Sequence, residues 1–368
     1  MIEEFAACES PTDDPAAVNR FVELLATHLD GLGRVRTYPP ASVGGGRFGK
    51  HLRCEFKLPG KSKSGQILAL GHSDTVWPLG TIRTMPVKRA RGRIWGPGVL
   101  DMKAGLALFI FGIEALRELD VPVKRSVLLQ VNSDEETGSE SSRALTEEAA
   151  RRSDAVLVLE PAAGLDGRLK TARKGVGDYS ITVRGRAAHA GLDFAEGVNA
   201  VVEMARQVER IASFTKLDRG ITVSPGVIHG GTRSNVVPDE CRSEIDVRIP
   251  RAADARYLER CFRSLKPFDK RCSIEVTGGV NRPPLERTAG VAKLFLLAQS
   301  LAAELGATLE ESAVGGGSDG NFTAALGIPT LDGLGAVGEG AHAANESIML
   351  NRVADRSALL AKLIAAIF

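Results

Sequence analysis

The chain has 368 residues, of which 43% are hydrophobic and 25% are charged, as in ordinary globular proteins. Its 47 Lys and Arg nearly balance 45 Asp and Glu, and no basic run with interleaved aromatic residues occurs, which argues against nucleic acid as a partner. Apolar runs stay short of the ~20 residues needed to span a membrane, so we expect no membrane association. A chain of this length exceeds what one hydrophobic core usually supports, so two domains are expected.

The cysteines indicate a reducing environment. There are five of them, widely scattered and without a C-x-x-C pair: Cys8, Cys54, Cys241, Cys261 and Cys272. Such an odd set in a chain of this size predicts reduced, mostly buried thiols and no disulfide framework. The first residues, M-I-E-E-F-A-A-C-E-S-P, carry acids where a signal peptide carries bases. We therefore expect a cytoplasmic protein.

Predicted helices and apolar strands alternate along the first part of the chain. A helix over 15–30 follows the acidic cap T-D-D-P and repeats apolar residues at helical spacing. The glycine-rich G-G-G-R-F-G then leads to the alternating strand H-L-R-C-E-F. The next strand, Q-I-L-A-L-G, is almost wholly apolar, which is typical of a strand covered on both faces, and it ends at His72.

Polar residues continue to follow apolar strands further along. A helix over 103–119 comes directly after Asp101, the strand S-V-L-L-Q-V-N ends in the acids of S-D-E-E-T-G, and A-V-L-V-L ends in Glu160. Open α/β sheets place their ligands just beyond the carboxyl ends of strands. We therefore predict an α/β sandwich with a site at that edge of the sheet.

The order of predicted strands and helices changes at about Lys174. Strands and helices follow in the order βαββαβ, the ferredoxin-like arrangement of a small sheet under two helices. After N-R-P-P-L-E the α/β texture resumes with helices over 290–305 and 351–368. The second domain, 174–285, is thus predicted to be inserted between the two parts of the first domain, 1–173 and 286–368.

Five potential metal ligands stand in distinctive settings. They are His72 in G-H-S-D-T-V, Asp101 in G-P-G-V-L-D-M-K-A-G, Glu136 in N-S-D-E-E-T-G, Glu160 in V-L-V-L-E-P and His342 in G-E-G-A-H-A-A-N-E. Two imidazoles and three carboxylates suit two zinc-like ions that share one carboxylate. Taken singly, each has an ordinary explanation, such as a surface turn, a helix N-cap or a solvated acid. The hypothesis of a metal centre therefore depends on the whole set.

The order and spacing of these motifs resemble the binuclear zinc hydrolases of the M20 metallopeptidase family, most closely its glutamate carboxypeptidase (carboxypeptidase G2-like) branch. The resemblance covers nearly the whole chain. It implies a zinc-exopeptidase-like α/β/α catalytic domain with an inserted ferredoxin-like lid and dimerisation domain. It also implies two Zn²⁺ ions, with cobalt or manganese as alternatives that accept the same ligands, and a homodimer formed through the inserted domain.

The resemblance assigns roles to the residues around the metals. It places Asp101, Glu136 and His342 on one ion and His72, Asp101 and Glu160 on the other, with Asp101 bridging both and followed by a cis peptide bond to Met102. Asp74 orients and strengthens the site. Glu135 takes a proton from the metal-bridging water, which attacks as hydroxide, and passes the proton to the departing amine.

Further candidates lie in or near the inserted domain. His189, in R-A-A-H-A-G, resembles a histidine that steadies the oxyanion in the partner subunit's site, while Asn235 and Arg248 resemble residues that bind the transition state and the substrate carboxylate. A structural role is the alternative for all three. In G-G-G-S-D-G, Gly317 and Ser318 are expected to contact substrate; this loop lacks the P-loop lysine, which argues against nucleotide binding.

Other conspicuous residues carry weaker signals. His28, His51 and His229 are interpreted as structural because they lie in an amphipathic helix or in strands. Near Arg282, the short match N-R-P-P-L resembles a segment that holds the substrate's acid in the glutamate-specific branch. The residue preference of the substrate pocket cannot be read from these short loops.

The resemblance leads to a specific functional expectation. It is hydrolysis of the amide that joins a peptidyl or N-acyl group to a C-terminal, glutamate-like amino acid. One alternative is deacylation of N-acyl amino acids, as in other members of the family, since motifs do not show on which side of the bond the substrate is bulky. A catalytically silent, metal-stabilised scaffold dimer is the second alternative, although neither a ligand nor Glu135 is missing.

Overall fold

The computed structural model describes residues 1–41, 47–61 and 63–367, and the chain forms two compact units. Unit 1 consists of 1–172, 287–314 and 318–368, and unit 2 consists of 173–286 and 315–317. Each unit has its own hydrophobic core. Residue 368, the predicted end of the last helix, and glycines 44–46 of the glycine-rich stretch lie outside the described residues.

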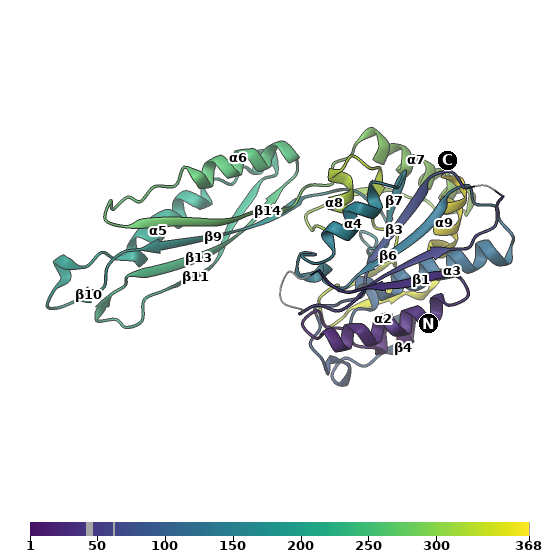
Figure 1. The fold of residues 1–368 in the computed structure, drawn as a ribbon, viewed down its shortest axis with the longest axis horizontal. Coiled ribbons are helices and arrows are strands. Elements are labelled where there is room, and N and C mark those ends of the chain that lie inside the picture. Colours follow the sequence, from purple (N-terminus) through teal and green to yellow (C-terminus); the bar gives the residue numbers. More distant parts are fainter. Residues whose placement is uncertain (42–46, 62, 368) are drawn as a thin grey trace. The chain divides into compact units, whose positions relative to one another are not determined.

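A six-stranded sheet forms the centre of unit 1, in the order β1-β2-β6-β3-β7-β16 (Figure 1). The strands are β1 (Gly33–Tyr38), β2 (His51–Phe56), β6 (Ser126–Asn132), β3 (Gln66–His72), β7 (Ala155–Val158) and β16 (Thr330–Leu331). Strands β6, β3, β7 and β16 run parallel, whereas β1 and β2 form an antiparallel edge. The carboxyl ends of β3, β6 and β7 therefore meet at one edge of the sheet.

Helices cover both faces of this sheet, because alternate side chains of its strands point to opposite sides. Ala69 and Leu129 belong to the large cluster on one face, and Leu68 and Leu128 belong to the smaller cluster on the other. The large cluster includes α1 (Ile2–Ala7), α2 (Pro15–Leu29), α3 (Ala104–Glu118), α7 (Ala289–Glu304) and α9 (Val353–Ala366). The opposite face carries α4 (Arg143–Ala150) and α8 (Gly320–Ala325) (Figure 1). Unit 1 is thus an α/β/α sandwich.

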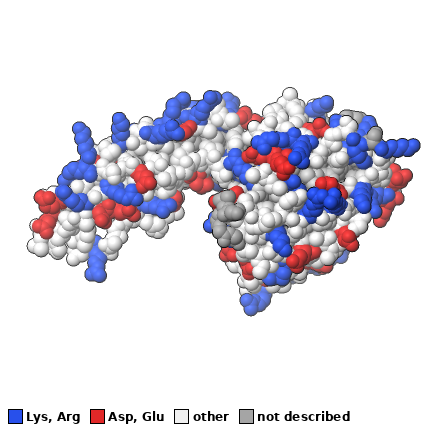
Figure 2. All heavy atoms as spheres, viewed as in Figure 1, with Lys and Arg blue, Asp and Glu red and all other residues white. Residues whose placement is uncertain are grey.

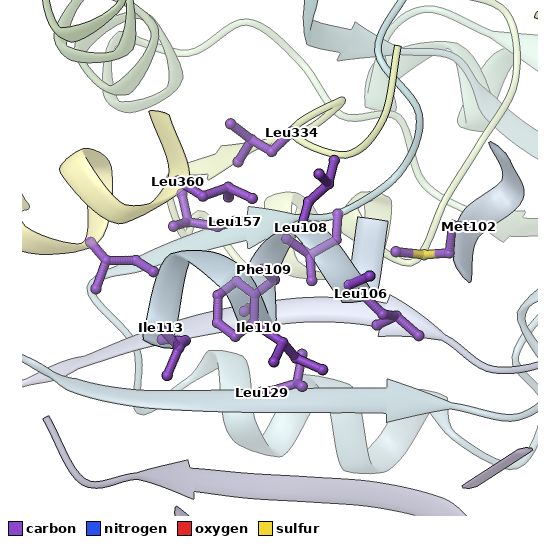
Figure 3. Close-up of a cluster of buried hydrophobic side chains, with 14 of the residues drawn as sticks. Met102, Leu106, Leu108, Phe109, Ile110, Ile113, Leu129, Leu157, Leu334 and Leu360 are labelled. Atoms are coloured by element: carbon purple, nitrogen blue, oxygen red, sulfur yellow. The ribbon is translucent and has the colours of Figure 1, made fainter. Parts of the chain in front are cut away.

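Helix α3 is the central element of the core. Its apolar side chains, with Phe109 fully buried among them, lie between Leu129 of β6, Leu157 of β7 and Leu360 of α9 (Figure 3). Burial of each such large side chain contributes about 2 kcal/mol. Because α3 follows Asp101 almost directly, the packing of α3 fixes the point at which the segment that contains Asp101 ends.

Short strands complete unit 1. A four-stranded sheet has the order β17 (Gly338–Glu339), β18 (Ser347–Met349), β5 (Arg93–Trp95) and β4 (Lys88–Ala90), and β15 (Glu311–Val314) pairs with β8 (Leu169–Arg173). The pairing of β18 with β5 joins segments far apart in sequence, with Ser347 opposite Trp95. This small sheet connects the segment that contains Asp101 to the one that contains His342.

Unit 2 is a four-stranded antiparallel sheet with two helices on one face. Its strands, in the order β11 (Thr222–Gly230), β13 (Glu240–Ile249), β9 (Gly175–Arg184) and β14 (Ser273–Arg282), pack under α5 (Ala200–Ala212) and α6 (Ala252–Arg263). The rings of Tyr179 and Phe262 stack at 3.8 Å between centroids. A two-stranded ribbon, β10 (Ala188–His189) with β12 (Val236–Val237), completes the unit.

The predicted fold class, an α/β/α domain together with a ferredoxin-like βαββαβ unit, is confirmed. Within the described part of the chain, each helix is too short or too polar to cross a lipid bilayer. Basic and acidic side chains are interspersed over the visible face of each unit, in line with the small formal net charge of +2 (Figure 2).

Candidate metal centre

The predicted ligands of unit 1 converge at the carboxyl edge of the parallel strands. His72 is the last residue of β3, Glu135 and Glu136 form a short helical turn after β6, and Glu160 lies just beyond β7. Parallel neighbours end on the same side, so residues far apart in sequence become adjacent there. The sequence-based placement of these four residues at strand ends agrees with the structure.

Asp101 reaches the same edge from a tight turn that precedes α3. Gly98 adopts a left-handed conformation with φ of 69°, and a Cβ at this position would lie 2.5 Å from the Thr75 side chain. The segment Val99–Lys103 follows, in which Asp101 and Met102 have non-helical backbone angles, and the helix proper starts at Ala104. The peptide bond between Asp101 and Met102 is cis, as expected from the family resemblance.

The two carboxylate oxygens of Asp101 face different imidazoles. Oδ1 lies 3.2 Å from Nε2 of His72, and Oδ2 lies 3.4 Å from Nε2 of His342. Each imidazole also faces a second carboxylate. Glu160 Oε1 is 3.4 Å from His72 Nε2, and Glu136 Oε2 is 3.3 Å from His342 Nε2. Asp101 therefore stands between two three-residue groups of potential donors.

These separations fit ligands of a shared ion. Two ligand atoms on one tetrahedral ion, each at about 2.0–2.1 Å, lie about 3.3 Å apart. An N–H···O hydrogen bond usually spans about 2.7–3.2 Å, so the contacts of His72 with Glu160 and of His342 lie at or beyond its upper limit. Among the described residues, buried Oε1 of Glu136 has no hydrogen-bond partner. The spacing of the donor set is therefore compatible with divalent ions shared by these residues.

The concentration of charge changes how these groups titrate. Burial opposes the charge of His72, but hydrogen bonds with Asp101, Asp74 and Glu160 hold its pKa well above the ordinary value. Hydrogen bonds with Asp101 and Glu136 raise the pKa of His342 to about 10, and burial raises the pKa of Glu136 to about 7. In the metal-free protein these shifts favour the charged imidazoles, and a dication would compete with their protons for the same carboxylates.

Asp74 fixes both His72 and the acidic turn. Its backbone carbonyl lies 3.0 Å from Nδ1 of His72, which leaves Nε2 directed at Asp101. Its side chain accepts hydrogen bonds from the backbone N–H of Glu135 (3.3 Å) and Glu136 (3.2 Å) and from the hydroxyl of Thr12 (2.8 Å). Sequence analysis did not single out Thr12. The orienting role expected for Asp74 has a geometric basis in these contacts.

Glu135 lies close to His72 and Glu160, two of the candidate metal ligands. One of its carboxylate oxygens, a nitrogen of His72 and an oxygen of Glu160 all lie within 4.8 Å of one another. Its carboxylate is half-buried. A carboxylate in this position is close enough to exchange a proton with a group at the centre, directly or through one water molecule.

The candidates of unit 2 occupy two places in that unit. His189 and Asn235 are neighbours, since Ala190 N donates to Asn235 O at 3.0 Å and His189 pairs with Val236. His189 is exposed, and its Nδ1 accepts hydrogen bonds from Gly191 N and Leu192 N, both at 3.1 Å. In the neutral imidazole these two bonds place the proton on Nε2.

Arg248, Gly317 and Ser318 have defined partners. Arg248 on β13 forms a two-pronged ion pair with Asp246, with Nη2 to Oδ2 at 2.7 Å. The carbonyl of Gly317 accepts from Arg173 Nη1 at 3.1 Å within unit 2. Ser318 is fully buried in unit 1, where its hydroxyl donates to Asp332 at 2.6 Å. The hydroxyl of Ser318 thus points into the protein, contrary to what a direct side-chain contact with substrate requires.

The environments of His51 and His28 agree with the structural roles predicted for these two histidines. His51 is buried and lies within hydrogen-bond distance of the hydroxyls of Ser133 (3.1 Å) and Ser141 (3.2 Å). His28 pairs with Glu4 at 2.8 Å. Both serve the packing of unit 1 away from the imidazoles of the donor cluster.

Sequence analysis missed one acid that bears directly on the centre. Glu346, four residues after His342, is fully buried and accepts hydrogen bonds from the backbone N–H of Gly98, Leu100 and Asp101. Its only sequence signal is an acid directly before the apolar stretch S-I-M-L. That pattern alone does not separate a buried acid from a solvated one.

The α/β/α domain places His, Asp and Glu donors at the carboxyl edge of its sheet, a donor set suited to a metal-dependent hydrolase. A family model described as Peptidase family M20/M25/M40 matches residues 68–366. The chain therefore belongs to this family, which confirms the resemblance read from the motifs.

Known proteins similar to this chain include a carboxypeptidase, a desuccinylase and an aminopeptidase. Carboxypeptidase G2 of Pseudomonas sp. (strain RS-16) is 29% identical, with 99% of this chain and 87% of that protein aligned. A succinyl-diaminopimelate desuccinylase of Cereibacter sphaeroides (strain ATCC 17025 / ATH 2.4.3) is 28% identical over 80% of this chain and 81% of its own length. The crystal structure of aminopeptidase PepT from Bacillus cereus ATCC 10987 has a TM-score of 0.78 at 25% identity, covering 99% of this chain and 96% of that chain.

Proposed function

We propose that the protein is a binuclear metal-dependent amidohydrolase that releases a C-terminal, glutamate-like amino acid from a peptidyl or N-acyl substrate. The observation that carries this proposal is the position of Asp101, whose two oxygens face His72 and His342 at 3.2 and 3.4 Å. A carboxylate shared in this way between two imidazoles is suited to bridge two ions.

In this proposal His72, Asp101 and Glu160 would hold one ion, and Asp101, Glu136 and His342 would hold the other. Zinc is the expected metal, and cobalt and manganese accept the same nitrogen and oxygen donors. When bound, two such ions supply Lewis-acid activation of a water molecule and of the scissile carbonyl. The contacts of Asp74 with His72 and with the Glu135–Glu136 turn keep the ligands in place before metal arrives.

Glu135 is the proposed general base. It accepts the proton of the attacking water and delivers it to the nitrogen of the departing amino acid. Its place within 4.8 Å of donors of His72 and Glu160 supports this role.

Charge favours a substrate that carries a carboxylate. Two dications against three carboxylates leave a formal charge of about +1 at the centre. In unit 2, Arg248 and Asn235 are proposed to bind the substrate carboxylate and the transition state, which requires Arg248 to exchange Asp246 for substrate. Gly317 is proposed to line the pocket, with buried Ser318 holding the loop beside it.

A hollow beside the centre offers room for a substrate group larger than acetyl. Its volume is about 530 Å³, and Glu136 lines it together with Phe48, Val76 and Pro78. Pockets of this size accept drug-sized ligands, well beyond the needs of an acetyl group. The similarity to a desuccinylase keeps deacylation of an N-acyl amino acid as the second candidate.

Unit 2 is also the proposed dimer interface. Strand β11 forms one edge of its sheet, and Val227 and Ile228 on it are 44% and 51% exposed. An open edge with exposed apolar side chains is suited to pair with a second copy. The proton on Nε2 of His189 would then serve the oxyanion in the partner subunit's site.

Five free cysteines support the cytoplasmic location expected from the sequence.

The reaction is tested by amine release from a panel of N-acyl and N-peptidyl amino acids, before and after zinc is restored to chelator-stripped protein. We expect zinc-dependent release of C-terminal glutamate or a similar acid. Glu135→Gln should keep two metals but lower kcat by about 10²–10⁴, because the general base is lost. Glu140→Gln, an exposed acid in the same loop, is the control. Equal loss of metal and activity in E135Q would contradict the assignment, and a preference for acetylated substrates would favour the deacylase.

A separate experiment tests the dimer. Light scattering after size-exclusion chromatography measures the molar mass of the protein in solution. Ile228→Lys places a charge on the open edge and should convert a dimer to a monomer, whereas Leu296→Lys, an equally exposed apolar site on α7 of unit 1, should not. A wild-type monomer with full activity would contradict both the interface and the role of His189 in a partner's site.

A further inference from the structure

The side chain of Glu346 is an acceptor for four N–H groups. Oε1 accepts from the backbone N–H of Leu100 (2.8 Å) and Asp101 (3.0 Å). Oε2 accepts from the backbone N–H of Gly98 (2.9 Å) and from Nε1 of Trp77 (2.7 Å). With Glu346 fully buried, both oxygens are used and solvent does not share them.

These four bonds join three segments, each of which carries a donor of the candidate metal centre. Trp77 follows His72 in the loop after β3, Leu100 immediately precedes Asp101, and Glu346 itself follows His342. The backbone adds to this connection, because Glu346 O accepts from Gly96 N at 3.3 Å where β18 pairs with β5. The three loops thus meet at one carboxylate, all within unit 1.

We infer that Glu346 is the positioning residue of the metal centre: it fixes the Asp101 carboxylate between His72 and His342 by holding the backbone N–H of Asp101 and of the turn before it. The inference rests on the proposed function for the presence of the ions, and it concerns a residue that contacts neither ion. Its effect is on the spacing of ligands, which must hold to a few tenths of an ångström for both groups of donors at once.

Glutamine is the informative replacement. It has nearly the same shape, but one of the two acceptor oxygens becomes an NH₂ donor. Either Leu100 and Asp101, or Gly98 and Trp77, would then face a donor in place of an acceptor. The turn has to move to relieve this, and Asp101 moves with it.

The test uses Co²⁺ alone as the probe, with zinc removed from the whole protein. Glu346→Gln should weaken cobalt binding by about 10–100-fold, the usual effect of replacing a residue that orients a ligand. The visible d–d absorption of the bound cobalt should also change, because it reports ligand geometry. A role confined to stability would lower the melting temperature of the metal-free protein and leave the cobalt spectrum as in wild type.

Glu203→Gln is the matched control. Glu203 is also buried and also accepts two backbone N–H groups, of Phe268 (2.9 Å) and Asp269 (3.0 Å), but it lies in unit 2. We expect this variant to bind cobalt with wild-type affinity and spectrum. An unchanged affinity and spectrum in E346Q, or an equal change in E203Q, would overturn the inference.

A second variant keeps the test decisive should E346Q not fold. Trp77→Phe removes one of the four donors and keeps an aromatic ring in place, so it should weaken cobalt binding severalfold with a smaller spectral change; wild-type behaviour would overturn the inference. Wild-type protein that binds no cobalt would instead overturn the proposed metal centre, and the role of Glu346 with it. The two failures are therefore distinguishable.

Discussion

Burial determines the chemistry of several single side chains outside the metal centre. Lys103, two residues after Asp101, is almost fully buried; burial lowers its pKa to about 8, while it donates to Cys8 O and lies 4.6 Å from the ring centre of Phe21. Burial raises the pKa of the Cys54 thiol to about 12 on the covered strand β2. A buried group shifts toward its neutral form because the low-dielectric interior disfavours charge.

The shift at Cys54 predicts selective protection from alkylation. A thiol with a pKa of about 12 is ionised in roughly one molecule in ten thousand at pH 8, and only the thiolate reacts. Iodoacetamide at pH 8 should therefore modify the half-exposed Cys261 of the native protein and leave Cys54 unmodified, as read by peptide mass spectrometry. The same reaction in urea, where all five thiols should react, is the control. Equal labelling of Cys54 and Cys261 in the native state would contradict this prediction.

At the scale of elements, the packing of α3 on the end of β7 decides where Glu160 lies. A Cβ on Gly105 would come within 2.1 Å of the carbonyl oxygen of Leu159, so helix and strand end touch backbone to backbone. Any larger residue there must push the two apart. Glu160 follows Leu159 directly. The close packing that Gly105 allows therefore keeps Glu160 level with the other proposed ligands at the edge of the sheet.

Gly105→Ala should therefore destabilise the protein, although alanine is otherwise preferred in helices by about 1 kcal/mol. We expect a net loss of about 1–3 kcal/mol from overpacking, and weaker metal binding because Glu160 is displaced. Denaturant unfolding of the metal-free protein and metal content measure the two effects. Gly112→Ala, in the same helix but with its Cβ 3.1 Å from Ser357 O, is the control and should cost less. Equal effects at both positions would exclude the proposed contact.

Sequence analysis predicted the long elements well and the short ones poorly. The strands that end at His72 and Asn132 are mostly apolar, and their short length between polar segments identifies them as strands. Strands β5 and β18 have three residues each and exist only through pairing between distant segments. Local periodicity contains no information on such pairing. Glu346 was missed for this reason, since its partners Gly98 and Asp101 become neighbours only in the folded chain.

The donor cluster shows the same division. His72 and Glu160 could be placed from strand ends alone, whereas the role of Asp101 required the family resemblance, because a helix N-cap explains an acid there equally well. The inward direction of the Ser318 hydroxyl depends on Asp332, a residue with no sequence signal of its own. Local patterns thus locate the site, and long-range contacts determine which atoms face it.

At the scale of the whole molecule, two separate cores imply two units of stability. The core of unit 2 consists of residues between Tyr179 and Cys272, and the core of unit 1 draws on segments from both sides of that insertion. All five proposed ligands belong to unit 1. A ligand that binds only the native state stabilises the unit that binds it.

Calorimetry should therefore resolve two transitions of which only one depends on metal. With zinc at about 1,000 times the Kd of each site, each of the two proposed ions should add about 4 kcal/mol, about 8 kcal/mol together, to the free energy of unfolding of unit 1 relative to protein in chelator. The transition of unit 2 should stay at the same temperature, and Glu203→Gln, which weakens only unit 2, identifies it. A single transition that shifts as a whole would contradict this independence.

The order of the proposed ligands along the chain has a consequence for biosynthesis. His72, Asp101, Glu136 and Glu160 all leave the ribosome before unit 2, and His342 leaves after it. At about 5–20 residues per second, the interval between Glu160 and His342 lasts roughly 10–40 s. During that time a nascent chain lacks both His342 and Glu346, the residue inferred to position Asp101. Under the proposed ligand assignment, the binuclear centre therefore closes only after the inserted unit has been made.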